Sequence, residues 1–299
     1  MKTQTDPKVD YAFKHVFGRE ESKPALKSLV GAVLQSAGEP GIASLELLNP
    51  FNAKDTEDDK LSVVDIKARD ESGRQFFVEM QMLASADFLQ RVLYYWACLY
   101  RDQLHESENY PILRPTMAVC FVDTPLFPDL VDYHHIFELR ERRRQRLFTD
   151  QMALHILELP KFHKALDELT TDLDRWLYFL RHGAELNAKA PPAALNLAEV
   201  LWAIGDLFMI SRIDPERELY EARLKARRDE VARQKYSREE GLRVGRAEGR
   251  EEGRAEILRQ LIQPLQKTLG REVTPSEDLQ SLSPEELEKA WTELQADLP

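Results

Sequence analysis

The sequence is short of cysteine and has no long apolar run. Its 299 residues include two cysteines, Cys98 and Cys120, and both lie inside apolar stretches. Two thiols cannot form a disulfide framework or a CxxC metal site, so we expect core residues in a reducing compartment. No uncharged run reaches the ~18 residues that a spanning helix needs, and no apolar segment follows Met1. This predicts a cytoplasmic protein without a signal peptide or a membrane partner.

Positive charge is also in short supply. The 41 Lys and Arg residues are outnumbered by 52 Asp and Glu residues, which gives a formal net charge of −11. Proteins that bind nucleic acid through bulk charge are usually basic, so DNA binding would need a local basic strip or metal ions. The sequence lacks the Walker A, GxGxxG, GxSxG and HExxH motifs. NTPase, dinucleotide-binding, serine-hydrolase and zinc-protease functions therefore have no support.

What the sequence does contain is an alternation of helical and strand patterns. Apolar residues recur with helical spacing at 10–17, 25–35, 86–104, 164–182 and 193–210. Short runs rich in β-branched and aromatic residues occur at 42–48, 61–69, 75–82, 115–122, 136–139 and 153–159. This order predicts an α/β core over residues 1–162, followed by a helical segment, 163–212, that packs on the core.

Residues 213–299 differ from the core in composition. Between Asp214 and Gln260 there are 13 Lys and Arg and 12 Asp and Glu residues, which predicts a long exposed helix or coiled coil. Glycine recurs in it every four residues, at Gly241, Gly245, Gly249 and Gly253. Because each helical glycine costs ~1 kcal/mol against alanine, the period indicates either a groove for a second helix or a repeat-expanded linker. The chain is predicted to end in a helical hairpin, with a capping box at Ser283–Glu286.

Two acids in neighbouring strands give the strongest sign of chemistry. Asp70–Arg74 has turn composition, and a three-residue loop with Gly73 in the left-handed region would place Asp65 directly opposite Glu79. Gln81 would share their face, because side chains alternate along a strand. Carboxylates this close repel each other unless a proton or a cation lies between them. Hard oxygen ligands favour Mg²⁺, with Mn²⁺ or Ca²⁺ as further options.

On spacing alone, the pair could also be two acids on the solvent-facing side of a hairpin. The flanking residues argue against that interpretation. Asp65 lies between Val64 and Ile66, and Glu79 lies between Val78 and Met80. A carboxylate in such an apolar strand is costly, which favours a functional pair.

Further motifs accompany these acids in order along the chain. They are Asp10-x-x-Phe13-Lys14-x-x-Phe17, Asp65-Ile66, Phe77-Val78-Glu79-Met80-Gln81, Arg91-x-x-Tyr94-Tyr95 and Leu157-Glu158-Leu159-Pro160-Lys161-Phe162. Over residues 6–182 the chain resembles the recombination-promoting nucleases (Rpn), a transposase-like family of the PD-(D/E)XK nuclease superfamily. The resemblance implies a restriction-endonuclease-like core, a mixed β-sheet flanked by helices, to which an all-α C-terminal extension is added here.

The resemblance also implies an activity. The chain would be a Mg²⁺-dependent DNA endonuclease, a hydrolase of phosphodiester bonds linked to recombination or transposition. Asp65 and Glu79 would be catalytic metal ligands, the Met80 backbone carbonyl a third ligand, and Gln81 the last motif residue. The family core usually has lysine at that last position, and glutamine has neither its charge nor a proton to transfer, although it can orient a water or a phosphate oxygen. The alternative is a catalytically weak or inactive DNA- or protein-binding module of the same fold.

Other residues are candidates for supporting roles. Asp10 and Lys14 share a helix face, either as a simple ion pair or as an extra acid and a phosphate contact near the metal. Arg91 follows the hairpin, where phosphate contacts are common. One basic run is either a solvated turn or the required DNA-binding strip: Arg140, Arg142, Arg143, Arg144 and Arg146. The resemblance implies DNA as partner. Since a double-strand break needs two active sites, we also expect a homodimer through the glycine-periodic helix.

Overall fold

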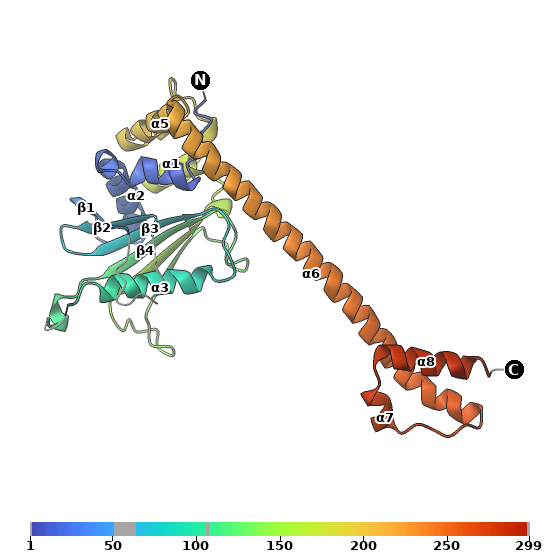
Figure 1. Cartoon of the computed structure of the whole chain (residues 1–299). Coiled ribbons are helices and arrows are strands. Elements are labelled where there is room, and N and C mark those ends of the chain that lie inside the picture. The colour runs from blue at the N-terminus through green and yellow to red at the C-terminus, as the bar shows by residue number, and fades with distance from the viewer. Residues whose placement is uncertain (1, 51–63, 106–107, 298–299) are drawn as a thin grey trace. The chain divides into compact units, whose positions relative to one another are not determined.

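The computed structural model describes residues 2–50, 64–105 and 108–297 (Figure 1). The chain divides into two compact units, residues 1–225 and 226–299. The first unit contains the predicted core 1–162 together with the helical segment 163–212. It extends into the following helix because Tyr220, only 8% exposed, belongs to the same apolar core.

A six-stranded mixed sheet forms the centre of the first unit. Its strands are β1 (Leu45–Leu48), β2 (Ile66–Asp70), β3 (Gln75–Gln81), β4 (Thr116–Val122), β5 (His134–Glu138) and β6 (Met152–Glu158). They lie in the order β1-β2-β3-β4-β6-β5, with the three central strands β3, β4 and β6 parallel and the other pairs antiparallel. This confirms the predicted α/β fold with a mixed sheet. Residues 61–63 of the expected strand 61–69 lie outside the described residues.

The turn between β2 and β3 has the predicted geometry. Gly73 has a φ of +88°, and the Asp70 N–H donates to the Arg74 carbonyl over 3.0 Å, which closes a three-residue loop. The conformation favours glycine, and a Cβ at Gly73 would also lie only 3.0 Å from the Arg114 side chain, which would have to shift. As a result Ile66 pairs with Val78, the register expected from the sequence.

Helices cover both faces of the sheet (Figure 1). One face packs against α1 (Asp10–Phe17), α2 (Lys23–Ser36), α4 (Asp172–His182) and α5 (Ala198–Ile210). Their shared core includes the aromatic side chains of Phe13, Phe17, Trp176 and Phe179. The other face packs against α3 (Phe88–Arg101) through Phe77, Cys120 and Ile156. The β2–β3 hairpin therefore lies between two helical layers.

Two helices are shorter than their apolar patterns suggested. α4 begins at Asp172 rather than at residue 164, because Thr171 caps it: its hydroxyl accepts from the Asp174 N–H over 3.1 Å. The buried Asp174 carboxylate accepts in turn from the Thr171 N–H. α5 begins at Ala198 rather than at residue 193, because the preceding residues form a 3₁₀ turn after a proline.

Helix α6 (Asp214–Thr268) is continuous across the boundary between the two units. At its start the Asp6 N–H donates to the Tyr220 hydroxyl over 2.9 Å. Toward its end Leu258 and Ile262 pack on α7 (Ser276–Ser281) and α8 (Pro284–Gln295). The predicted capping box precedes α8, with reciprocal Ser283 and Glu286 hydrogen bonds. The expected long helix and terminal hairpin are thus both present.

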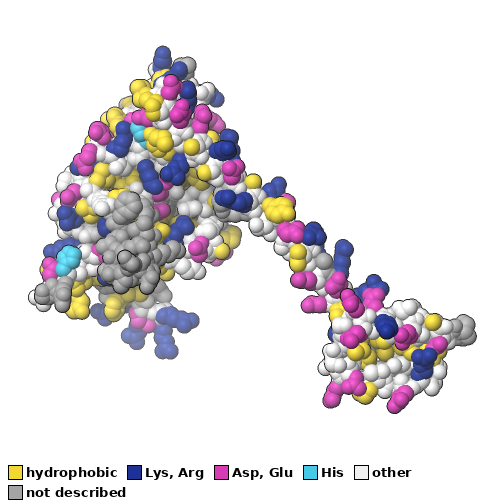
Figure 2. All heavy atoms as spheres, in the orientation of Figure 1, with side chains coloured by type: hydrophobic (Ala, Val, Ile, Leu, Met, Phe, Trp, Pro, Cys, Tyr) yellow, Lys and Arg dark blue, Asp and Glu magenta, His cyan; other side chains and the backbone are white. Residues whose placement is uncertain are grey.

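The periodic glycines of α6 make no close contact inside the described part of the chain. A Cβ built at any of the four would meet nothing within 4 Å. Lys and Arg side chains alternate with Asp and Glu along this helix (Figure 2). Among the helices of the described residues, none has the length and apolar character required to span a bilayer.

Candidate active site

Asp65 and Glu79 meet where β2 and β3 separate. Glu79 lies in β3, and Asp65 directly precedes β2. The Asp65 N–H donates to Glu79 Oε1 over 3.0 Å, and the Met80 N–H donates to Asp65 Oδ2 over 3.0 Å. Each acid is therefore held by the backbone of the opposite strand. The structure brings the predicted pair together.

Burial makes both carboxylates difficult to ionise. The Glu79 side chain is buried, and desolvation, followed by the nearby Asp65 charge, raises the pKa of Glu79 to about 8. Burial also raises the pKa of Asp65, although the Lys14 ammonium and the Met80 N–H oppose this shift. Two neighbouring acids in a poorly solvated position form a site that a cation would stabilise.

Lys14 of α1 enters the same site. Its ammonium lies 3.0 Å from Asp65 Oδ1 and 2.6 Å from Asp10 Oδ1. Burial lowers the pKa of Lys14, but the two carboxylates outweigh this effect and the pKa is raised, so the side chain stays charged. The Asp10–Lys14 pair expected from the sequence is present, and it extends to Asp65.

Gln81 and Arg91 form a second polar contact beside the carboxylates. Arg91 of α3 donates to Gln81 Oε1 over 2.8 Å, and Gln81 Nε2 donates to the Leu83 carbonyl. Arg91 is close enough to Glu79 to lower its pKa, although less strongly than burial raises it. The predicted residues Gln81 and Arg91 thus lie beside Glu79. Arg91 comes from α3 and Lys14 from α1, and these two helices cover opposite faces of the sheet.

The chemistry of these donors suits a hard divalent cation. In an extended strand the N–H and C=O of one residue point the same way, so the Met80 carbonyl faces the side of Asp65, to which its N–H donates. Two carboxylates and one carbonyl are oxygen donors of the kind that Mg²⁺ accepts together with waters. Among the described residues there is no cluster of three or more His, Cys, Asp or Glu side chains arranged for a metal. A magnesium site would therefore depend on this pair, on backbone oxygen and on water.

The basic run lies at the other end of the sheet. The carboxylates lie near the end of the parallel strands at which Gln81, Val122 and Glu158 are paired. Met152 lies at the opposite end of these strands. The hairpin between β5 and β6 extends from this opposite end of the strands and exposes its five arginines, Arg140, Arg142, Arg143, Arg144 and Arg146. Glu141 closes the turn by accepting from the N–H groups of two of them. The run is an exposed turn, separated from the acid pair by the length of the strands.

The motif that begins at Leu157 has a structural role in the described chain. Glu158 is fully buried, and its carboxylate accepts from the Phe127 N–H over 2.9 Å. Lys161 pairs with Glu158 and donates to the carbonyls of Phe127 and Leu130, both over 2.7 Å. These contacts fix the loop before β5 against the end of β6.

Two histidines of β5 and β6, on other strands than Asp65 and Glu79, belong to a hydrogen-bonded chain. Ser36 Oγ lies 3.0 Å from His134 Nδ1, and His134 Nε2 lies 3.1 Å from His155 Nδ1. Burial, then the neighbouring His155 and His135, lower the pKa of His134 to about 4. The two rings connect α2 to β5 and β6.

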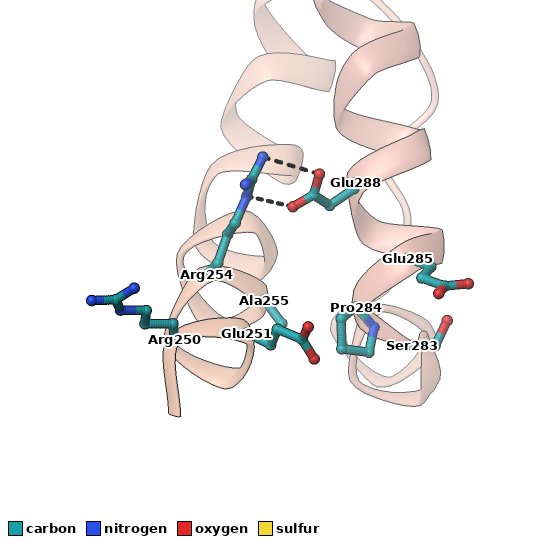
Figure 3. A pocket seen from close by; sticks show the side chains of 8 residues that line it. All are labelled: Arg250, Glu251, Arg254, Ala255, Ser283, Pro284, Glu285 and Glu288. Carbon is teal, nitrogen blue, oxygen red and sulfur yellow. Dashed lines mark hydrogen bonds and ion pairs between the residues drawn. The ribbon is translucent and has the colours of Figure 1, made fainter. Parts of the chain in front are cut away.

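A pocket of about 720 Å³ lies in the second unit (Figure 3). Arg254 points toward Glu288 across it and forms a two-pronged ion pair, while Arg250 points away. The lining also contains Glu251 and Glu285, so acids outnumber arginines. The pocket offers no excess of positive charge for a phosphate and is not part of the candidate site.

Sequence reasoning missed the contacts that cross between elements. Lys14 was expected to pair with Asp10, and one interpretation placed both near the metal, but no spacing in the sequence indicated a direct contact between Lys14 and Asp65. Tyr95 packs on Phe77, and burial followed by the Glu79 charge raises the pKa of its hydroxyl. No local pattern signals such contacts, because they arise when helices pack on the sheet.

Comparison with known proteins agrees with this geometry. A family model described as PD-(D/E)XK nuclease family transposase matches residues 7–237, well over half of the chain. No curated protein and no solved structure matches the chain. Nucleases of the PD-(D/E)XK superfamily generally use divalent metal ions. The match contains the acid pair, both helices that reach it and the first part of α6, and the chain belongs to the PD-(D/E)XK nuclease family transposases.

Proposed function

We propose that the chain is a Mg²⁺-dependent DNA endonuclease that hydrolyses phosphodiester bonds during recombination or transposition. The observation that carries this proposal is the pairing of Asp65 and Glu79, each bonded to the backbone of the other's strand. Buried acids with raised pKa values are unfavourable for folding, and such groups are frequent in active sites. Membership of the nuclease family makes hydrolysis of DNA the first reaction to test.

The residues have separate roles in this proposal. Asp65, Glu79 and the Met80 carbonyl would hold the ion, and Gln81 would orient a water or a phosphate oxygen, alone or through Arg91. A bound Mg²⁺ would lower the pKa of a water and stabilise negative charge on the phosphate. Mn²⁺ could replace it, because the same hard oxygen ligands suit both ions.

Removal of one ligand tests the proposed activity. Wild-type protein with Mg²⁺ should nick supercoiled plasmid DNA, and Asp65→Ala should lose nearly all of this activity because one carboxylate no longer holds the ion. Glu79→Gln should lose it as well, while Glu46→Gln serves as the matched control because Glu46 is an exposed β1 acid paired with Arg69. Equal cleavage by wild type and Asp65→Ala would end the assignment. DNA binding without any cleavage would favour the binding module.

The same proposal includes two further surfaces. The exposed arginines of the β5–β6 hairpin would contact the DNA backbone, since the acidic chain otherwise repels a polyanion. The glycine stripe of α6 would hold a second copy, because it is exposed and a helix backbone can approach it closely. A homodimer would supply the two active sites that a double-strand break requires.

A further inference from the structure

The polar ends of Gln81 are already engaged within the chain. Its carbonyl oxygen accepts from Arg91, and its amide nitrogen donates to the Leu83 carbonyl. A neutral side chain held at both ends cannot deliver the charge that the family core usually places at this position. Gln81 is better suited to fixing the direction of Arg91.

A positive charge nevertheless reaches the acid pair from another element. The Lys14 ammonium contacts Asp65 as well as Asp10. Helical spacing explains the contact with Asp10, but the contact with Asp65 depends on how α1 packs on the sheet. The Lys14 side chain is 40% exposed and that of Asp65 is 13% exposed. Lys14 is therefore the more exposed partner of the pair, and an incoming phosphate could reach it.

We infer that Lys14 of α1 supplies the site with the positive charge that the family core carries two residues after its glutamate, and that Gln81 is a positioning residue for Arg91. This inference rests on the proposed nuclease function. A lysine is a compact point charge, suited to a single phosphate oxygen, whereas Arg91 can donate twice from the opposite face of the sheet. Together they would offset the charge of a phosphate brought beside two carboxylates.

Moving the charge back into the strand tests the inference. In single-turnover nicking at saturating Mg²⁺, Lys14→Met should be slower by about 10²-fold, the usual effect of removing one preorganised group. Lys14→Met combined with Gln81→Lys should recover at least about tenfold, because the charge returns to the usual family position. Lys23→Met is the matched control, since Lys23 also pairs with an acid on a helix but lies outside the site.

A binding measurement without DNA separates this role from a structural one. Calorimetric titration with Mn²⁺ should show that Lys14→Met binds the ion at least as tightly as wild type, because a competing ammonium has left Asp65. Weaker Mn²⁺ binding by Lys14→Met would overturn the inference. So would a cleavage rate of Lys14→Met within threefold of the wild-type rate, or a double variant that cleaves no faster than Lys14→Met. If the wild-type protein does not cleave DNA, the nuclease proposal fails. If Asp65→Ala binds Mn²⁺ as tightly as wild type, the acid pair is not the metal site.

Discussion

Glu79 is unfavourable for stability at the position where it occurs. Its side chain is 7% exposed and lies beside a second carboxylate, and its strand neighbours Val78 and Met80 are apolar. An uncompensated buried acid weakens a fold, whereas an apolar side chain of similar size would strengthen it. The cationic groups of Lys14 and Arg91 offset only part of this cost in the metal-free chain. The cost is understandable if the pair serves chemistry instead of stability.

His134 provides a test of residue-scale electrostatics away from the acids. Its pKa is lowered to about 4 in the folded chain, against about 6.5 in an unfolded one. The unfolded chain therefore gains a proton first, so stability present above pH 6.5 should fall as the pH drops toward 4, by at most about 3 kcal/mol. His134→Gln should reduce this loss in urea unfolding at pH 7 and pH 4.5. The groups facing His134 are Ser36, His135, His155 and Glu39.

An exposed histidine supplies the control for that measurement. His163→Gln removes one imidazole from a solvent-facing position and controls for the loss of a histidine as such. An identical loss of stability in wild type and His134→Gln would contradict the assignment of the pH effect to this ring.

Sequence reasoning succeeded at residues whose role is decided locally. Gly73 indicated the loop, the loop determined the register, and the register paired Asp65 with Glu79. The contacts of Lys14 and Arg91 could not be predicted in this way. They depend on the positions at which α1 and α3 pack on opposite faces of the sheet, which no short segment encodes.

At the scale of elements, the proposed functions place DNA attraction on the β5–β6 hairpin and catalysis at the acid pair, which are different parts of the sheet. Its arginines lie at the end of the strands opposite the carboxylates. Replacing Arg142, Arg143 and Arg144 by glutamine should weaken DNA binding similarly for all sequences and reduce the salt dependence, with a change in slope of about one per lost phosphate contact. Metal affinity should not change. Fluorescence anisotropy at several salt concentrations measures both quantities.

Three other arginines give a charge-matched control for the hairpin. Arg217, Arg228 and Arg271 are exposed and lie outside the sheet. Their replacement by glutamine removes the same net charge from other surfaces. If this control weakened DNA binding as much as the hairpin variant does, the hairpin would have no special part in DNA binding.

Element boundaries show where patterning alone is insufficient. The apolar spacing from residue 164 continued a helical pattern that the backbone does not follow. The Thr171 cap and the buried Asp174 start α4 later, because capping satisfies the first N–H groups of a helix. The charged pattern of α6 was easier to interpret, because oppositely charged side chains three or four residues apart, such as Lys235 and Glu239 or Glu240 and Arg243, support a helix.

At the scale of the whole molecule, α6 is the element through which two copies would join. Gly245→Leu combined with Gly249→Leu should strengthen the isolated helix and disrupt the proposed dimer, because bulky side chains would fill the stripe. The two alanine substitutions are the control, since they remove a helical cost of about 1 kcal/mol each with little added bulk. Light scattering decides between the outcomes. A monomeric wild type, or a leucine variant with unchanged dimer mass, would contradict the prediction.

The hydrogen bond from the Asp6 N–H to the Tyr220 hydroxyl has a consequence for dividing the chain. Tyr220 is part of the nuclease core, although it lies on the helix that continues into the second unit. A fragment that ends at residue 212 would expose the apolar surface that Tyr220 covers and would leave the N-terminal segment without this anchor. A fragment that ends at Lys225 keeps both. The shortest piece of this chain suitable for studying the acid pair on its own therefore includes the first three turns of α6.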